Sequence, residues 1–484
     1  MPEATGEGKT MALKVLRYTV IWIPRPRLVK LHRKPVRGQS MHGASVRLQW
    51  LGQVVALALA ASAFAQPAEI ATDTSNAPFG ITLAGPAPAV LPQRLPSIMS
   101  HARDLGAAWF RVNVLWACSE PWHGCVEKSE GRLDWSLTDA IVGEAEKVGV
   151  SLLLNVRGYS CGTPCDRPNP LYASDPELKL RAYETFIREL VRRYKGRIRH
   201  WQIENEITER LFWRGTLDEY HRMLAAAYRV IKAEDAAAQV LLAGVPTMDA
   251  HFVSDPSDHR FRIRAFAAER LNTWKAIVAE ARDNFDILDL HLYDSPASIP
   301  ERIELFRRHL QSLGAHKPIW VTETGGPDTR NPAGDPRYFN KTPPTEAHAS
   351  EVVMRLVLAL SAGAERVFWF HLIGSGTGDE FAHVALVHGQ EQQLAFSTFR
   401  LVARKLAGFA SVHSVNAGRG ISAYRFSRPA GDVYVLWAAK DSASATLASA
   451  GTRVLVTEVD GTTSRLAATS LTTGTVPIFV EPEP

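Results

Sequence analysis

Short apolar segments alternate with amphipathic segments from residue 78 onward. The apolar segments have strand length and are 79–83, 109–116, 150–156, 201–206, 240–245, 287–291, 318–323 and 367–370. Apolar side chains recur at helical spacing in 138–149, 175–194, 217–234, 265–281, 299–313, 346–362 and 394–407. Eight strands in this alternation predict an α/β fold, a (β/α)8 TIM barrel, because a doubly wound sheet would have about six strands.

The pattern changes after Gly408, where strand-like segments follow one another without helices. These segments are 422–426, 433–437, 454–459 and 477–480, and Asp460-Gly461 is typical of a hairpin turn. Residues 409–484 are therefore predicted to form a small antiparallel β-sandwich domain, which follows a barrel domain of residues 66–408.

The first 65 residues differ from the rest in charge. They contain ten of the 55 Lys and Arg residues and two of the 50 Asp and Glu residues. The net charge of +5 therefore originates in this N-terminal extension, and the remainder is mildly acidic. A basic surface for nucleic acid is not expected on the folded part.

Residues 41–66 have the form of a secretory signal peptide. Arg47 precedes an apolar segment at 50–60, and Ala63-Phe64-Ala65 is a small-x-small cleavage site. The apolar segment is short for a membrane span, so we predict cleavage, no stable membrane insertion, and a periplasmic or secreted protein. A retained signal anchor is the alternative.

The four cysteines form two local pairs, Cys118 with Cys125 and Cys161 with Cys165. An exported chain favours disulfide bonds, and local bridges would hold two loops after the second and third strands. A CxxxC redox centre or a metal site is the alternative, although no histidines cluster nearby.

Two predicted strands end in a glutamate. Glu206 ends the fourth strand after Asn205, and Glu323 ends the seventh before two glycines. In a (β/α)8 barrel both acids would lie at the carboxyl ends of the strands and face each other across the mouth. Two facing carboxylates are what the cleavage of a glycosidic bond requires.

Further motifs accompany these acids in a characteristic order. They are GAAWFR at 106–111, GRLDW at 131–135, Asn205-Glu206 followed by FWRGTLDEY at 212–220, HLY at 291–293 and TETG at 322–325. With these motifs the chain resembles the retaining glycoside hydrolases of clan A, in particular families 39 and 5, over residues 78–408 and in the trailing β domain. One departure is LNVRG at 154–158, where some relatives have a histidine at the end of the third strand.

The resemblance implies a role for each matching residue. Glu206 would be the general acid/base and Glu323 the nucleophile. Asn205 would hydrogen-bond the sugar 2-hydroxyl, Tyr293 would hold Glu323 ionised, and Arg111 would add a positive charge. A rim salt bridge for Glu206, a strand-end cap for Asn205 and a structural ion pair for Arg111 are the alternatives.

Aromatic residues are candidates for stacking on sugar rings. Trp369 resembles the aromatic floor of such sites, and an apolar barrel residue is the alternative. Trp116, Trp122 and Trp213 lie in predicted rim segments and would either stack on sugars or pack a loop. His291 would contact the sugar or satisfy the core.

The sequence thus predicts an exported retaining glycoside hydrolase that acts on a carbohydrate and needs no cofactor or metal. His371, His383 and His388 lack the compact spacing of metal ligands, and no Gly-x-Ser-x-Gly motif supports a serine hydrolase. A non-catalytic carbohydrate-binding barrel and a metal-dependent barrel hydrolase are the alternatives.

Overall fold

The structure is a computed structural model, which describes residues 77–83, 91–117, 124–158, 175–209, 212–246, 260–327, 345–374, 384–447 and 451–483. The predicted signal segment, Cys118, Trp122, Cys161, Cys165 and His383 lie outside the described residues. Cys125 is described and buried. Because the other three cysteines are not described, the two disulfide bridges stay predictions.

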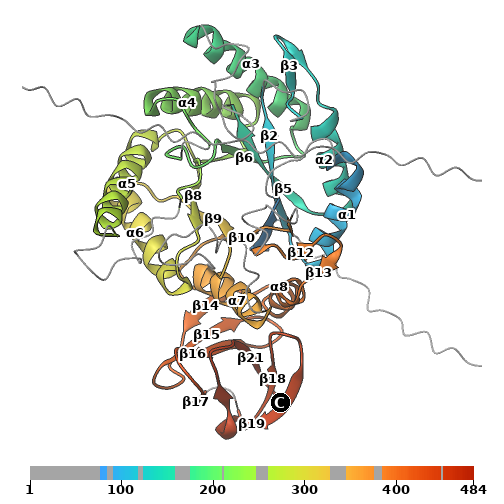
Figure 1. Cartoon of the computed structure of the whole chain (residues 1–484), viewed down its shortest axis with the longest axis vertical. Helices are drawn as coiled ribbons and strands as arrows, with labels where there is room; N and C mark the ends of the chain where they lie inside the picture. The colour runs from blue at the N-terminus through green and yellow to red at the C-terminus, as the bar shows by residue number, and fades with distance from the viewer. Residues whose placement is uncertain are drawn as a thin grey trace, which may run out of the picture. The chain divides into compact units, whose positions relative to one another are not determined.

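Eight parallel strands form the central sheet (Figure 1). In chain order they are β1 (Phe79–Thr82), β2 (Trp109–Leu115), β5 (Ser151–Arg157), β6 (His200–Ile203), β7 (Gln239–Leu241), β8 (Leu288–Leu292), β9 (Ile319–Thr324) and β10 (Arg366–Phe370). The hydrogen-bonded order is β7-β6-β5-β2-β1-β10-β9-β8. Parallel bridges of Leu241 with Ile287 and of Val245 with Leu290 join the two edges, so the sheet closes into a barrel.

Helices surround this barrel and follow its strands (Figure 1). They are α1 (Leu91–Asp104), α2 (Ser136–Val148), α3 (Pro176–Tyr194), α4 (Leu217–Glu234), α5 (Arg260–Ala281), α6 (Ile299–Ser312), α7 (Thr345–Ser361) and α8 (Leu394–Lys405). Local chemistry defines several of their ends. Thr216 and Glu219 make a reciprocal capping box at the start of α4, and Gly149 ends α2 in the left-handed conformation.

The helix α1 was not predicted from the sequence. Its Pro92 and Pro96 lower the helix propensity, and Pro96 lies inside the helix. The structure forms the helix because Leu95, Met99 and Ala102 are buried at helical spacing against the barrel. Tertiary packing here overrides local propensity.

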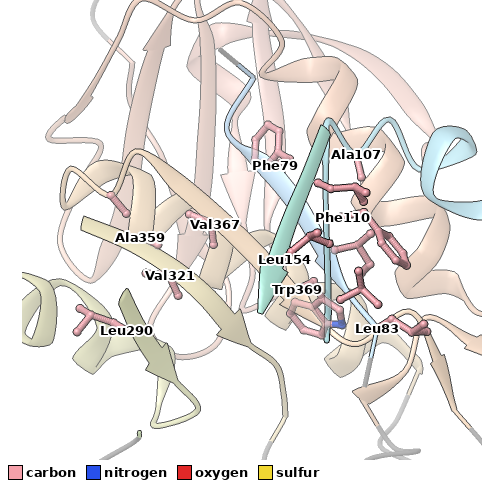
Figure 2. Packing of buried hydrophobic residues seen from close by; sticks show 14 of the residues in the cluster. Phe79, Leu83, Ala107, Phe110, Leu154, Leu290, Val321, Ala359, Val367 and Trp369 are labelled. Carbon is pink, nitrogen blue, oxygen red and sulfur yellow. The ribbon is translucent and has the colours of Figure 1, made fainter. Parts of the chain in front are cut away.

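The barrel strands bury both of their faces. Inside the barrel, Trp109, Leu153, Leu241, Ile287, Trp320 and Phe368 form one apolar cluster. Residues of the opposite face pack against the helices in a larger cluster, which Figure 2 shows in part with Phe110, Leu154, Val321, Val367 and Trp369. This double burial explains the nearly continuous apolar runs in the sequence.

An antiparallel sheet follows the barrel, in the order β14-β15-β16-β21-β18-β19. Its strands are β14 (Ser411–Ser414), β15 (Ile421–Ser427), β16 (Val433–Ala438), β18 (Arg453–Thr457), β19 (Thr463–Ala467) and β21 (Ile478–Pro482), and β17 (Ala443–Ser444) pairs with β20 (Thr472–Thr473). One sheet face packs against Ala445, Leu447 and Leu471 in its own core. The predicted fold class, a TIM barrel with a C-terminal sandwich, is confirmed.

Short elements complete the described fold. The hairpin of β3 (Glu127–Ser129) and β4 (Arg132–Leu133) follows β2, and the strands β11 (Ile373–Gly374), β12 (Val387–His388) and β13 (Glu391–Gln392) follow β10. Two 3-10 turns are η3 (Pro296–Ser298) and η6 (Ala468–Ser470). None of the described helices has both the length and the apolar character needed to cross a membrane.

Candidate active site

Glu206 and Glu323 lie together at the carboxyl ends of the fourth and seventh barrel strands. A carboxylate oxygen of each lies within 4.8 Å of the other and of a ring nitrogen of His291. Both side chains are largely buried, with 13% and 10% of their areas exposed. The predicted meeting of these two carboxylates at the barrel mouth is therefore present in the fold.

The backbone after β6 takes an unusual path that points Glu204 and Glu206, which flank Asn205, to different partners. Glu204 and Glu206 have positive φ angles of 67° and 39°, which are uncommon for residues other than glycine. Glu206 faces His291, whereas Glu204 accepts hydrogen bonds from Arg157 and from the Gly158 N–H. Strained backbone of this kind occurs preferentially at functional sites.

Two donors hold the carboxylate of Glu323. Arg111 Nη1 lies 2.6 Å from Oε1, and the Tyr293 hydroxyl donates to Oε2 at 2.6 Å. Burial alone would raise the pKa of Glu323, but the positive charges of His291 and Arg111 and the Tyr293 hydrogen bond outweigh it and lower this pKa. Glu323 is therefore held ionised.

Glu206 has the opposite environment. Burial is the largest influence and raises its pKa, and the nearby negative charge of Glu323 acts in the same direction. His291, whose Nδ1 lies 2.7 Å from Glu206 Oε1, opposes this effect without overcoming it. Two glutamates at one site thus favour different protonation states.

Arg111 binds both Glu323, the candidate nucleophile, and Asn205, the residue before the candidate acid Glu206. Besides Glu323, its guanidinium donates to Asn205 Oδ1 and to Gln202 Oε1, each at 2.7 Å. Because Asn205 Oδ1 accepts from Arg111, the side-chain NH2 of Asn205 is the group that can donate to a ligand. Arg111 and Asn205 are both buried.

A second buried layer lies beneath these residues and was not predicted from the sequence. Asp289 accepts hydrogen bonds from the Thr322 N–H at 3.1 Å, from the Thr322 hydroxyl at 2.7 Å and from Gln202 Nε2. His291 Nε2 lies 3.2 Å from the Thr322 hydroxyl. The signal in the sequence is a polar residue in the middle of an apolar strand, as in WQI at 201–203 and LDL at 288–290.

Arg157 lies in the segment 154–158, where the sequence departs from the pattern of the family that it resembles. It ends β5, pairs with the fully buried Glu204 at 3.3 Å and lies over the Phe212 ring, 5.3 Å from its centroid. Glu204 immediately precedes Asn205, so this ion pair supports the segment that carries both Asn205 and Glu206. At the position of this departure, the structure therefore has a buried ion pair that supports the strand end carrying Glu206.

The expected aromatic platforms need correction. Trp369 is fully buried, its ring N–H donates to the Val384 carbonyl, and it packs in the outer cluster of Figure 2. Alternation along β10 places Phe370 rather than Trp369 on the inner face, and the Phe370 ring lies 5.8 Å from that of Tyr293. The packing alternative therefore holds for Trp369.

Trp116 and Trp213 are likewise buried. Trp116 stacks on Phe186 at 5.8 Å between ring centroids, and Trp213 contacts Tyr220 edge-on at 6.0 Å. Neither indole has a face open to a sugar, so both belong to the packing of rim segments. A strand or rim position alone does not determine which face an aromatic side chain occupies.

The same cluster could in principle ligate a cation. Glu206, His291 and Glu323 each offer one ligand atom within the 4.8 Å group. However, Arg111 and Tyr293 already bind the two oxygens of Glu323. A cation would have to displace or tolerate the buried guanidinium, which makes this donor set a poor fit for a resident metal.

No family model and no curated protein matches the chain. Solved structures are similar to it. A family 39 glycoside hydrolase from the gut symbiont Bacteroides cellulosilyticus WH2 superposes with a TM-score of 0.63 at 15% identity, covering 85% of this chain and 82% of that one. A glucosidase from Croceicoccus marinus gives 0.58 at 15% identity, covering 84% and 95%.

A family 39 β-xylosidase from Caulobacter crescentus is also similar, with a TM-score of 0.55 at 12% identity, covering 84% of this chain and 96% of that one. Identities this low establish similarity of fold and not of substrate. The chain therefore has the barrel-and-β-domain fold of solved glycoside hydrolases, several of them from family 39, as its sequence motifs predicted.

Proposed function

We propose that this protein is a retaining glycoside hydrolase, with Glu206 as the general acid/base and Glu323 as the nucleophile. One observation carries the proposal. Two carboxylates at the barrel mouth, with oxygens within 4.8 Å, have pKa values shifted in opposite directions. A separation of about 5–5.5 Å is typical of retaining enzymes, whereas inverting enzymes need about 6.5–9.5 Å to admit a water molecule.

The proposed reaction proceeds in two steps. Glu323 attacks the anomeric carbon and forms an ester bond while the glycosidic C–O bond breaks, and Glu206 gives its proton to the departing oxygen. Water then attacks the same carbon, Glu206 takes the water proton, and the ester bond to Glu323 breaks. The donors on Glu323 and the burial of Glu206 support these starting protonation states.

Asn205 and Arg111 complete the proposed site. The Asn205 NH2 group would donate to a sugar hydroxyl beside the anomeric carbon, and Arg111 would hold Asn205 and Glu323 in fixed relative positions. Phe370 is a better candidate than Trp369 for the apolar surface under the sugar.

The roles of the two glutamates can be tested with azide. Glu206→Ala should lose about 10²- to 10⁴-fold on glycosides that need leaving-group protonation and much less on a dinitrophenyl glycoside. Azide should rescue this variant and give a glycosyl azide of retained configuration. Glu323→Ala should give the inverted azide, because azide fills the vacated space.

Three outcomes would contradict the proposal. Exchanged azide configurations would mean that the two roles are reversed, and full activity in either variant would reject the mechanism. A wild-type protein that binds glycans but hydrolyses no aryl glycoside or polysaccharide of a broad panel would be a carbohydrate-binding barrel. Activity abolished by a chelator and restored by a metal would indicate the metal-dependent alternative.

Export belongs to the same proposal. The signal segment motivates it, and a solved structure with a TM-score of 0.53 is described as a conserved exported protein from Bacteroides fragilis. Exported protein should begin near residue 66 and contain the Cys118–Cys125 and Cys161–Cys165 bridges. Non-reducing peptide mapping that found four free thiols, or cross-pairing, would reject the bridges.

A further inference from the structure

Asp289 is a fully buried acid that touches no candidate catalytic carboxylate, yet it connects to both. Through Gln202 it supports Arg111, which binds Glu323. It also reaches His291, which binds Glu206, both directly, with Oδ2 3.4 Å from His291 Nε2, and through Thr322. The hydrogen bonds through Gln202 fix the position of Arg111. The hydrogen bonds through Thr322 also determine whether Nε2 of His291 carries a proton.

The direction of the hydrogen bonds through Thr322 follows from hydrogen-bond chemistry. The Asp289 carboxylate already accepts the Thr322 N–H and the Gln202 amide, so the Thr322 hydroxyl donates its one proton to Asp289. The same hydroxyl can then only accept from His291 Nε2, 3.2 Å away. Nε2 of His291 must therefore carry a hydrogen.

This hydrogen decides what Glu206 can do. With Nε2 protonated, the proton between His291 Nδ1 and Glu206 Oε1 can move to Glu206 and leave a neutral imidazole. Without it, the same transfer would leave an imidazolate, and Glu206 would remain an ionised acceptor. The 2.7 Å separation of Nδ1 and Oε1 permits the transfer.

We infer that Asp289 is a positioning residue which, by its direct contact with His291 and through Thr322, keeps Nε2 of His291 protonated and so allows Glu206 to deliver its proton to the leaving group. The inference rests on the proposed function and deepens it. Gly244 adds a steric constraint, because a Cβ at this position would lie 2.0 Å from His291 Nε2. The imidazole is thus held both by its hydrogen bonds and by backbone packed against it.

The charges around His291 agree with this arrangement. The charged or titratable groups of the described residues that act on it are Glu206 after β6, Asp289 and Tyr293 on and after β8, Glu323 on β9 and, through Glu323, Arg111 on β2. When His291 and Glu206 share one proton, that pair is neutral overall, and Arg111 balances one of the two carboxylates Glu323 and Asp289. The negative charge of Asp289, whose Oδ2 lies 3.4 Å from His291 Nε2, favours a hydrogen on this nitrogen, and Asp289→Asn removes that charge.

Asp289→Asn tests the inference, with Asp294→Asn as the matched control. An asparagine that keeps its oxygen toward the Thr322 N–H presents an NH2 group to the Thr322 hydroxyl, which then donates to His291 Nε2. Asp294 is a buried acid close to the end of the same strand, paired with Arg302 and outside this network.

Two substrates with the same sugar and different leaving groups separate the possible effects. In Asp289→Asn, kcat/KM should fall about tenfold or more for a phenyl glycoside relative to a dinitrophenyl glycoside, because proton donation is what is lost. Asp294→Asn should leave this ratio unchanged. Equal losses on both substrates in Asp289→Asn would overturn the inference, since they would indicate only misplaced side chains.

A spectroscopic measurement on the wild-type protein keeps the inference testable if the variant does not fold. Nitrogen-15 NMR of histidine-labelled protein, assigned with His291→Gln, should show a protonated Nε2 at neutral pH. An unprotonated Nε2 would overturn the inference even if the enzyme is active. A wild-type protein without activity on any glycoside would instead contradict the proposed function, whatever the state of Nε2.

Discussion

At the scale of single residues, the site is built from two glutamates whose surroundings make them unlike. Glu323 has a guanidinium and a phenol as partners, whereas Glu206 has an imidazole as its partner, and burial is the largest influence on the Glu206 pKa. A buried carboxyl group with donors favours the charged form, and one whose burial dominates favours the neutral form. The charged form suits the nucleophile Glu323, and the neutral form suits the acid Glu206.

Tyr293→Phe should raise the pKa of Glu323, because the variant loses a 2.6 Å hydrogen bond that favours the carboxylate. The nucleophile must be ionised, so the acidic limb of the kcat/KM profile should move to higher pH by about one unit. A pH series of initial rates measures this shift. Tyr194→Phe is the control, because Tyr194 donates to Asp139 on a helix away from the site. If the acidic limb did not move in Tyr293→Phe, Tyr293 would not be what keeps Glu323 ionised.

The protonation of His291 should also affect stability. Burial alone would lower its pKa, but the charges of Glu323 and Asp289 and the hydrogen bonds to Asp289 and Glu206 raise it from 6.5 to about 10. A raised pKa stabilises the folded state fully below about pH 6.5, and this contribution is lost as pH rises through about 10.

Thermal or denaturant unfolding across this range measures the contribution. The difference in stability between wild type and His291→Gln should be largest below about pH 6.5 and should shrink toward pH 10. Groups that titrate in both proteins cancel in the difference. A gap that widened with rising pH would mean that His291 is neutral in the folded protein.

At the scale of elements, the site depends on how closely neighbouring strand ends approach. The segment after β7 forms an isolated bridge between Gly244 and Asn205, and its backbone lies against the His291 ring. A side chain at residue 244 would occupy the place of the imidazole. Glycine is required here by close packing and not by an unusual backbone angle.

Gly244→Ala should therefore displace His291 and impair catalysis. A misplacement of about 1 Å can cost roughly 100-fold in rate, and we expect a loss of that order in kcat/KM. Gly143→Ala is the matched control, because a Cβ there meets nothing within 4 Å and the residue lies in helix α2. If Gly244→Ala retained full activity, the tight contact with His291 would not be needed for function.

At the scale of the whole molecule, the barrel and the antiparallel sheet share one core. Along β16, Val433, Val435 and Trp437 belong to the cluster of the barrel helices, whereas Tyr434 and Leu436 face the second cluster. The Thr398 hydroxyl of α8 donates to the Val459 carbonyl at 2.8 Å. Lys405 at the end of α8 also pairs with Glu481 of β21.

This shared core predicts cooperative unfolding of residues 77–483, although the chain changes pattern at Gly408. Calorimetry should show one transition for barrel and sheet together, with the van't Hoff and calorimetric enthalpies in agreement. Thr398→Val should lower that single transition, because it leaves the buried Val459 carbonyl without this donor. Two separate transitions in the wild type would contradict the prediction.

The sequence by itself determined the elements and their order. Double burial of parallel strands produces continuous apolar runs, and helices packed on one side produce regular apolar spacing, so eight strands and seven of the eight described barrel helices could be predicted. Glu206 and Glu323 could be identified because a carboxylate that ends an apolar strand is conspicuous, and the barrel topology brings strand ends together.

Only the tertiary structure decided which groups meet and which face each side chain takes. Gln202, Asp289 and Thr322 form the layer under the glutamates because closure of the barrel brings β6, β8 and β9 together. Trp369 turned outward and Phe370 inward because strand residues alternate between faces, and the register that fixes this alternation depends on pairing with distant strands. Local sequence specifies a strand, whereas contacts between strands specify its inner face.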